Sequence, residues 1–159
     1  EICHVRSYLD IQKMRYGDRL DYQIRIPEEL KKLYTVKLLI QPLAENSIYH
    51  GIKESDRKGT ILITAGEEPG GFYLCVRDDG LGISQETLTI LNADLKRGVT
   101  VSDGGYGIFN VNERIRLYFG RDYGLELRSC TGEWTEAVIH LPKYIPERTE
   151  WDVSDFDRR

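Results

Sequence analysis

Asp78 stands where an acidic side chain must find a hydrogen-bond partner. It ends the apolar segment 72–78, and because side chains alternate between the two faces of a strand, it shares the inward face of that segment. A buried carboxylate is costly unless a donor bonds to it, so Asp78 is expected to accept a hydrogen bond from a ligand. Gly80 and Gly82 would let the backbone approach that ligand closely. A surface turn between a strand and a helix is the alternative for these residues alone.

Asn46 offers a second group with ligand chemistry. On a helix over 36–50 it falls at the margin of the apolar side, in line with Leu43 and His50. A neutral amide oxygen suits Mg²⁺, which takes few protein ligands and completes its shell with water and phosphates. A structural asparagine bonded to a neighbouring loop is the alternative. His50 could touch a phosphate or ribose, or simply be favoured by the helix dipole.

A glycine-rich stretch over 104–107 precedes a predicted helix, whose N-terminal N–H groups can receive phosphate oxygens. It is neither a Walker A motif nor a Rossmann fingerprint, and a flexible start of a helix is the alternative. Lys96 and Arg97, in the loop before it, could neutralise phosphate charge or could be solvated. Thr135 alternates with apolar residues of a strand and faces inward. Its hydroxyl could share a water or a ligand amine with Asp78, or bond to backbone.

The composition indicates which classes of protein fit this chain. With 159 residues, 40% hydrophobic and 30% charged, the chain is expected to form one globular domain. The net charge of −4 argues against nucleic-acid binding, and no apolar run is long enough for a membrane span. Three cysteines without a paired motif suggest reduced, cytosolic thiols. The chain starts at Glu1 inside a predicted helix, so we expect it to be a piece of a larger protein.

Hydrophobic periodicity and turn residues predict the elements that must position these groups. Helices are expected over 2–16, 36–50, 84–92 and 108–118, and strands over 22–26, 60–65, 72–78, 125–129 and 134–141. A loop is expected over 93–105. This order predicts an α+β fold, a two-layer sandwich with helices on one face of a mixed, mostly antiparallel sheet.

Three motifs then resemble a known superfamily. They are 41–46 continuing to His50 and Gly51, Asp78-x-Gly80-x-Gly82, and Gly105-x-Gly107. In this order they resemble the N box and the two glycine boxes of the GHKL ATPases. The stretches "YLDIQKMRYGDRL", "LLIQPLAENSIYHGI" and "GYGIFNVNERIRLYFG" are similar to LytS/YesM-type sensor histidine kinases, over about Val5 to Pro142. The resemblance implies the Bergerat fold of these ATPases, with ATP held between the Asn46 helix and a lid over 93–105.

By position, the resemblance also implies roles. Asn46 would bind Mg²⁺ and Asp78 would accept from the adenine amino group. The other positions implied are Gly80, Gly82 and Ile83 around the adenine, Gly105, Gly107 and Ile108 at the phosphates, and Thr135 supporting the adenine end. The chain departs from many relatives at Tyr49, where they have a lysine that contacts phosphate.

For the whole protein, the resemblance implies transfer of the γ-phosphoryl group of ATP to a histidine upstream of this chain. Residues 1–17 would end the upstream dimerisation and phosphoacceptor helix, 18–142 would be the ATP-binding catalytic domain, and 143–159 would be a polar tail. The implied partners are ATP with Mg²⁺, the protein's own dimerisation region in a homodimer, and a response regulator. The domain would be cytoplasmic in an integral membrane protein. A degenerate nucleotide sensor and a GHKL serine kinase acting on a partner regulator are the alternatives.

Overall fold

The computed structural model describes residues 1–33, 35–53, 57–98 and 106–143. Within these ranges five strands form one sheet in the order β1-β2-β3-β5-β4. The strands are β1 (Leu20–Arg25), β2 (Gly59–Glu68), β3 (Gly71–Asp78), β4 (Gly124–Cys130) and β5 (Trp134–Pro142). Strand β1 is parallel to β2, and the other pairs are antiparallel. The sheet is therefore mixed and mostly antiparallel, as predicted.

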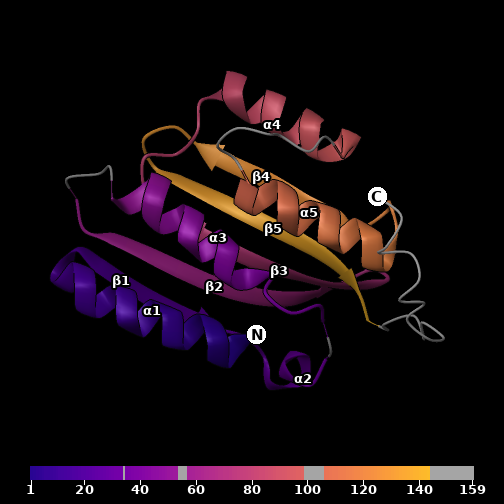
Figure 1. Ribbon diagram of the computed structural model, residues 1–159, viewed down its shortest axis with the longest axis horizontal. Helices are drawn as coiled ribbons and strands as arrows, with labels where there is room; N and C mark the ends of the chain where they lie inside the picture. The colour runs from indigo at the N-terminus through magenta and orange to yellow at the C-terminus, as the bar shows by residue number, and fades with distance from the viewer. Residues whose placement is uncertain (34, 54–56, 99–105, 144–159) are drawn as a thin grey trace, which may run out of the picture.

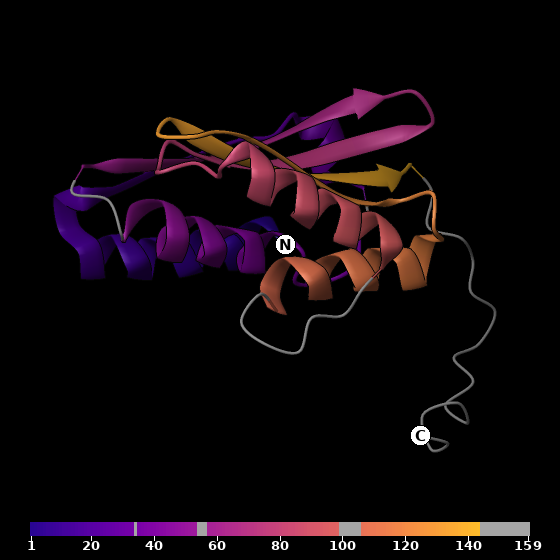
Figure 2. The same cartoon turned by 90° about the horizontal axis from the view of Figure 1, so that it is seen from above.

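The helices are α1 (Ile2–Tyr16), α2 (Glu28–Lys31), α3 (Ile40–Asn46), α4 (Gln85–Arg97) and α5 (Tyr106–Phe119), with a 3-10 turn η1 (Gly17–Arg19) and a π-helical turn η2 (Ser47–Ile52). The short α2 lies at an edge of the sheet, and the other helices lie on one side of it (Figures 1 and 2). Apolar side chains of both layers form one core between them. Its most deeply buried members include Leu9, Ile40, Leu43, Ile61, Ile63, Leu95, Ile115 and Ile139. The predicted two-layer α+β architecture is confirmed.

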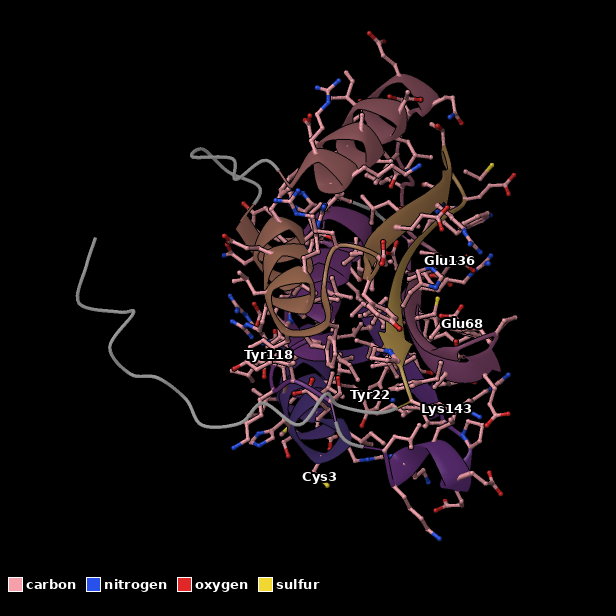
Figure 3. The ribbon with its side chains drawn as sticks, turned by 90° about the vertical axis from the view of Figure 1, so that its right-hand side faces the viewer. Cys3, Tyr22, Glu68, Tyr118, Glu136 and Lys143 are labelled. Atoms are coloured by element: carbon pink, nitrogen blue, oxygen red, sulfur yellow. The ribbon has the colours of Figure 1, made fainter. Side chains whose placement is uncertain are left out.

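The other face of the sheet has no helix on it among the described residues, and polar side chains cover much of it. Glu68 and Glu136 point away from the helical layer (Figure 3). Arg77 donates to Glu136 over 2.8 Å, and its guanidinium lies 4.4 Å from the centre of the Trp134 ring. His140 Nδ1 lies 2.9 Å from Glu68 Oε2. Hydrogen bonds between polar side chains thus satisfy this face, and the core-side face carries the cavity described below.

The helix predicted over 36–50 begins later than expected. Helix α3 starts at Ile40, and its backbone continues as η2 to Ile52. The reason lies at Leu38, whose φ of 62° is left-handed and cannot continue a right-handed helix. Pro42 then falls in the first turn of α3, where its missing N–H costs no helical hydrogen bond.

The helix predicted over 84–92 extends to Arg97, so the prediction of a loop at 93–97 is wrong. Ser84 caps α4 by accepting from the N–H of Thr87, and Gly98 ends it with a left-handed φ of 71°. Leu88 and Leu95 are both buried and lie two turns apart, which extends the apolar stripe beyond the predicted end. The remainder of the predicted lid, 99–105, and the tail beyond Lys143 lie outside the described residues. In the described part of the chain, each helix is too short or too polar to cross a bilayer.

Candidate functional site

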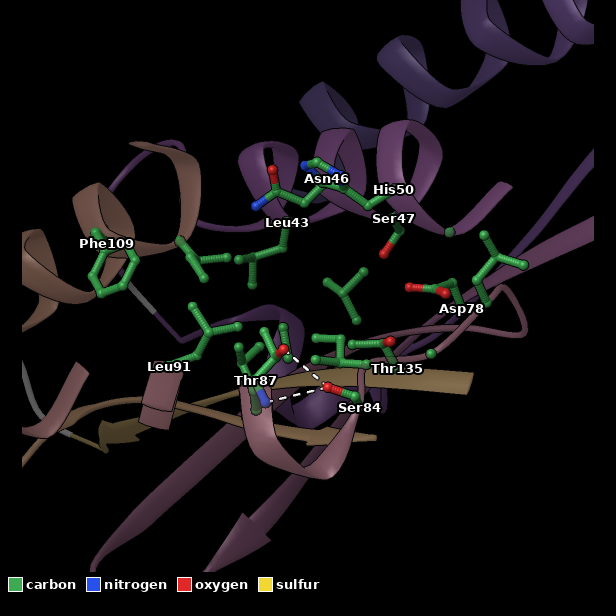
Figure 4. Close-up of a pocket in the computed structure, with 18 residues that line it drawn as sticks. Leu43, Asn46, Ser47, His50, Asp78, Ser84, Thr87, Leu91, Phe109 and Thr135 are labelled. Atoms are coloured by element: carbon green, nitrogen blue, oxygen red, sulfur yellow. Dashed lines mark hydrogen bonds between the residues drawn. The ribbon is translucent and has the colours of Figure 1, made fainter. Parts of the chain in front are cut away.

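A cavity of about 520 Å³ lies between the sheet and the helical layer (Figure 4). Helix α3 and turn η2 form one wall, α4 and the loop before it another, and the start of α5 closes one end. Its lining consists of Leu43, Asn46, Ser47, His50, Gly51, Val76, Asp78, Leu81, Gly82, Ile83, Ser84, Thr87, Leu91, Ile108, Phe109, Leu127, Thr135 and Ala137. A mostly apolar cavity of this size with a few converging polar groups is typical of a small-molecule or cofactor site.

Asp78 is the most deeply buried polar group among the lining residues of this cavity. As the last residue of β3 it pairs with Ile61 of β2 and Thr135 of β5, and it is only 3% exposed. Its Oδ1 accepts from the N–H of Gly80 over 3.1 Å, and the hydroxyl of Ser47 hydrogen-bonds to the same carboxylate. Figure 4 shows Ser47 and Asp78 side by side, with their oxygen atoms pointing toward each other. A carboxylate can accept about four hydrogen bonds, so these two donors leave acceptor capacity for a ligand.

The environment of Asp78 perturbs its ionisation. Burial of the carboxylate raises its pKa to about 6, although the hydrogen bonds from Ser47 and Gly80 act in the opposite direction. At neutral pH the group is therefore ionised but only weakly solvated, which makes it a strong hydrogen-bond acceptor for a ligand that excludes water.

Two glycines bring the backbone up to this acid. A Cβ atom on Gly51 would lie 2.5 Å from Asp78 Oδ1, and a Cβ on Gly80 would lie 2.4 Å from the Cα of Gly51. Turn η2 and the loop after β3 thus touch through main-chain atoms. Gly82 has a φ of 66°, and its backbone lies against the carbonyl of Cys130. Gly80 does not line the cavity but holds Asp78, whereas Gly82 and Ile83 form part of the wall.

Asn46 lies on the helical wall of the cavity, where α3 meets the start of α5. It is the last residue of α3, and a Cβ on Gly107 would lie 3.0 Å from its Nδ2. The first turn of α5, including Ile108, therefore faces the amide of Asn46. His50 follows one turn later at the exposed rim of the cavity, with its ring centre 4.9 Å from that of Tyr49. Gly105 lies outside the described residues.

Thr135 connects the sheet to the loop that carries Ile83. Its hydroxyl lies 3.2 Å from Ser129 Oγ, which accepts from the N–H of Ile83 and donates to the carbonyl of Trp134. Thr135 lines the cavity beside Asp78, its cross-strand neighbour. That its hydroxyl shares a ligand amine with Asp78 stays a prediction.

The structure also identifies lining residues that the sequence reasoning missed. Ser47 is the most informative, because its burial and its bond to Asp78 place a hydroxyl at the acid. Its position one turn after the buried Leu43 was a signal in the sequence. Lys96 and Arg97 lie instead in the last turn of α4. None of the described residues that line the cavity is a lysine or an arginine.

Comparison with known proteins agrees with this geometry. Residues 33–145 match the family described as histidine kinase-, DNA gyrase B-, and HSP90-like ATPases. The chain belongs to this ATPase family. It is 36% identical over 138 residues to the sensor histidine kinase YesM of Bacillus subtilis, covering 87% of this chain and 22% of YesM. It is 33% identical over 142 residues to the sensor histidine kinase BtsS of Escherichia coli, covering 89% of this chain and 23% of BtsS.

This chain thus spans about a quarter of the length of these curated relatives. Solved structures share its fold. The histidine kinase AdeS of Acinetobacter baumannii superposes with a TM-score of 0.56 at 14% identity, covering 90% of this chain and 65% of that chain. A histidine kinase domain from a blue-light activated kinase of Erythrobacter litoralis superposes with a TM-score of 0.55 at 16% identity, covering 88% of this chain and 63% of that chain. The resemblance to LytS/YesM-type sensor histidine kinases is confirmed.

Proposed function

We propose that this domain binds Mg·ATP in the cavity and, within a longer sensor histidine kinase, donates the γ-phosphoryl group to a histidine upstream. The observation that carries the proposal is the convergence of Asn46, Asp78, Thr135 and Ile108 on one cavity. These residues come from a helix, two neighbouring strands and a second helix. They are far apart in sequence. Asp78 and Thr135 suit the adenine, Asn46 suits the metal ion, and the backbone at Ile108 suits the phosphates.

The adenine occupies the end of the cavity at Asp78. The ionised carboxylate accepts from the amino group of the base, and Thr135 supports this contact. Apolar side chains, with Leu43, Ile83 and Ala137 among them, flank the base and exclude water. Gly80 keeps Asp78 in place through its N–H, and Gly82 sets the path of the wall beside Ile83.

The metal ion and the phosphates occupy the end at Asn46. Its amide oxygen is a hard, neutral ligand of the kind that Mg²⁺ takes. Among the described residues no group of three or more histidine, cysteine, aspartate or glutamate side chains could hold a metal alone, which fits an ion whose other ligands are water and phosphate oxygens. Gly107 and Ile108 offer N–H groups in the first turn of α5 to the phosphates, and His50 contacts ribose or phosphate at the rim. The same role is proposed for Gly105, which lies outside the described residues.

The domain's part in transfer is positioning and charge stabilisation, the main contributions of a protein to phosphoryl transfer. The bound metal supplies charge neutralisation at the phosphates. The accepting histidine and its acid–base partner come from upstream, with residues 1–17 ending that helical region, 18–142 forming the catalytic domain and 143–159 a polar tail. We further propose a homodimeric, membrane-anchored protein whose cytoplasmic part passes the phosphoryl group to a response regulator.

One observation favours a second candidate, a nucleotide sensor that does not transfer phosphate. Tyr49 stands where many relatives have a lysine, and Lys53 Nζ lies 4.5 Å from the centre of its ring, outside the cavity lining. The likeness to proteins named sensor histidine kinases favours the kinase. A serine kinase acting on a partner is supported less, because no observation on this chain points to it.

Calorimetric titration of the domain with ATP and with ADP, each with and without Mg²⁺, tests the binding site. Asn46→Ala is expected to abolish the gain in ATP affinity that Mg²⁺ gives, and to leave metal-free binding unchanged. Asn110→Ala, at an exposed position of α5, is the matched control. If the wild-type domain bound neither nucleotide, the proposed function would be wrong.

A longer chain that includes the upstream helices tests transfer with γ-labelled ATP. An acid-labile, base-stable label indicates phosphohistidine and supports the kinase. An acid-stable label indicates a serine kinase, and binding without any label indicates the sensor.

A further inference from the structure

The start of helix α3 is held by a carboxylate from a distant part of the chain. Glu1, directly before α1, accepts hydrogen bonds from the backbone N–H groups of three consecutive residues, Leu38, Leu39 and Ile40. The bonds to Leu39 and Ile40 measure 3.0 and 3.1 Å. The first N–H groups of a helix lack partners inside the helix, and a negative charge there is favoured by the helix dipole. Glu1 therefore ties α1 to the beginning of α3.

The same segment is held from the opposite side by α5. Arg114 Nη1 donates to the carbonyl oxygens of Lys37 and Leu38, over 2.9 and 3.2 Å. Leu38 is thus bonded to α1 through its N–H and to α5 through its carbonyl. Its left-handed φ of 62° is unfavourable for a leucine and is kept by these contacts. We name residues 37–40, where α1, α3 and α5 meet, the α3 junction.

The α3 junction bears on the nucleotide site because α3 is short and carries Asn46 at its far end. Seven residues of helix rise about 10 Å, so a tilt at Ile40 moves Asn46 with it. Helix α5 contacts α3 at both ends. Gly107 lies against the Asn46 amide, and Arg114, two turns further along α5, binds the junction. The two helices are therefore fixed relative to each other at both ends of α3.

We propose that Glu1 and Arg114 are positioning residues for Asn46, and that the α3 junction couples helix α1 to the binding of Mg·ATP. This inference rests on the proposed function of the site. A displacement of α1 that withdraws Glu1 frees the start of α3, which moves Asn46 away from the metal. By thermodynamic reciprocity, Mg·ATP binding favours the position of α1 in which Glu1 holds the junction. In α1, the buried Val5 and Leu9 pack into the core, whereas the Glu1 carboxylate before the helix couples it to the nucleotide site.

The test measures the Mg²⁺ enhancement, defined as the ratio of ATP dissociation constants without and with Mg²⁺. Glu1→Gln and Arg114→Gln are each expected to reduce this ratio about tenfold, within the usual range of coupling between sites. Metal-free ATP binding, which depends on Asp78, is expected to stay within twofold of wild type. Arg114→Lys keeps a cation that can reach both carbonyls and is expected to restore most of the enhancement. A residue with a merely structural role would not change this ratio.

Two controls match the variants in charge and location. Asp10→Asn removes an acid of α1 that accepts from the Tyr22 hydroxyl and so anchors α1 to β1 instead of α3. Glu113→Gln changes an exposed charge of α5 beside Arg114. Both are expected to keep the wild-type enhancement. Urea unfolding of each variant without nucleotide shows that the folded state is measured, and if Arg114→Gln does not fold, Glu1→Gln decides alone.

Failure of this inference differs from failure of the proposed function. A wild-type domain that binds no ATP refutes the function itself. A wild-type domain with a clear Mg²⁺ enhancement that Glu1→Gln leaves unchanged overturns the coupling alone. An equal loss in Asp10→Asn would also overturn it, because the effect would then come from loosening α1 in general.

Discussion

The two ends of the cavity are built by different means. At the end proposed to bind the adenine base, called the base end, Asp78 belongs to the central strand β3. Two antiparallel ladders hold it in register between Ile61 and Thr135. At the side proposed to bind Mg²⁺, called the metal end, Asn46 is the last residue of a seven-residue helix. The position of its amide depends on how α3 and α5 pack. One end is fixed by backbone hydrogen bonds of a sheet, and the other by contacts between helices.

Because of this difference, we expect the base end to recognise the nucleotide and the metal end to respond to changes elsewhere in the protein. A sheet register cannot shift gradually, because a slip by one residue would turn Asp78 to the opposite face. Helices can tilt by small amounts at a modest cost, so the metal end can respond to a change elsewhere in the protein. We therefore expect substitutions at the base end to affect all adenine nucleotides equally, and substitutions at the metal end to affect only the contribution of Mg²⁺.

The largest effect is expected from Gly80→Ala at the base end. The new methyl group would overlap the backbone of Gly51, which cannot move without displacing η2. Such overpacking costs up to about 3 kcal/mol in the free energy of unfolding, and the resulting shift of Asp78 should remove nucleotide binding with or without Mg²⁺. Urea unfolding and titration with ADP check both effects.

Gly132→Ala is the control for backbone conformation. Gly132 has a φ of 81° but open space around it, so the substitution should cost only the strain of a left-handed alanine, about 1 kcal/mol, and leave ADP binding intact. A Gly80→Ala protein as stable as Gly132→Ala would show that the contact between η2 and the loop after β3 is looser than described.

A smaller effect is expected from Asp78→Asn. The variant loses a charge-assisted hydrogen bond to the adenine amino group, worth about 2 kcal/mol, so affinity for ATP and ADP should fall about 30-fold. Because the pKa of Asp78 is about 6, wild-type affinity should fall about fivefold between pH 6 and pH 5 as the acceptor is protonated. Asp78→Asn should bind weakly at every pH. An unchanged pH profile in this variant would assign the titration to another group.

Stability should respond to pH in the opposite sense. The carboxyl pKa rises from 3.8 to about 6 on folding, so between these values the folded protein holds a proton that the unfolded chain has released. The contribution of Asp78 to stability is full below about pH 4 and is lost as the pH rises through about 6. Two pKa units correspond to about 3 kcal/mol, and urea unfolding of Asp78→Asn should lack this slope.

The same contrast explains what could be predicted from the sequence. The base end follows from local rules, because alternation along 72–78 already turned Asp78 inward. The metal end required contacts between segments far apart in the chain. Periodicity extended the helix of Asn46 back to Val36, whereas the left-handed Leu38 delays its start to Ile40. No local pattern could reveal this, because Glu1 and Arg114 hold Leu38 from 37 and 76 residues away.

The smallest expected effect comes from Ser47→Ala, which tests whether the base end is tuned by its neighbouring helix. The hydroxyl of Ser47 lowers the pKa of Asp78 against the effect of burial. A hydrogen bond to an ionised carboxylate contributes about 1.5 kcal/mol, and about 1.4 kcal/mol equals one pKa unit. The midpoint of the pH profile of ATP binding should therefore rise by about one unit. Affinity at pH 8 should change little, since Asp78 remains ionised there.

Ser84→Ala is the matched control for this loss of a hydroxyl. Ser84 also lines the cavity, but it caps α4 through the N–H of Thr87. Its removal should cost about 1 kcal/mol of stability without moving the midpoint. A midpoint that shifts equally in both variants would mean that the polarity of the cavity, and not the bond from η2, sets the ionisation of Asp78. In that case the pKa of Asp78 would depend on the lining of the cavity and not on η2, and only the helices at Asn46 would transmit changes to the site.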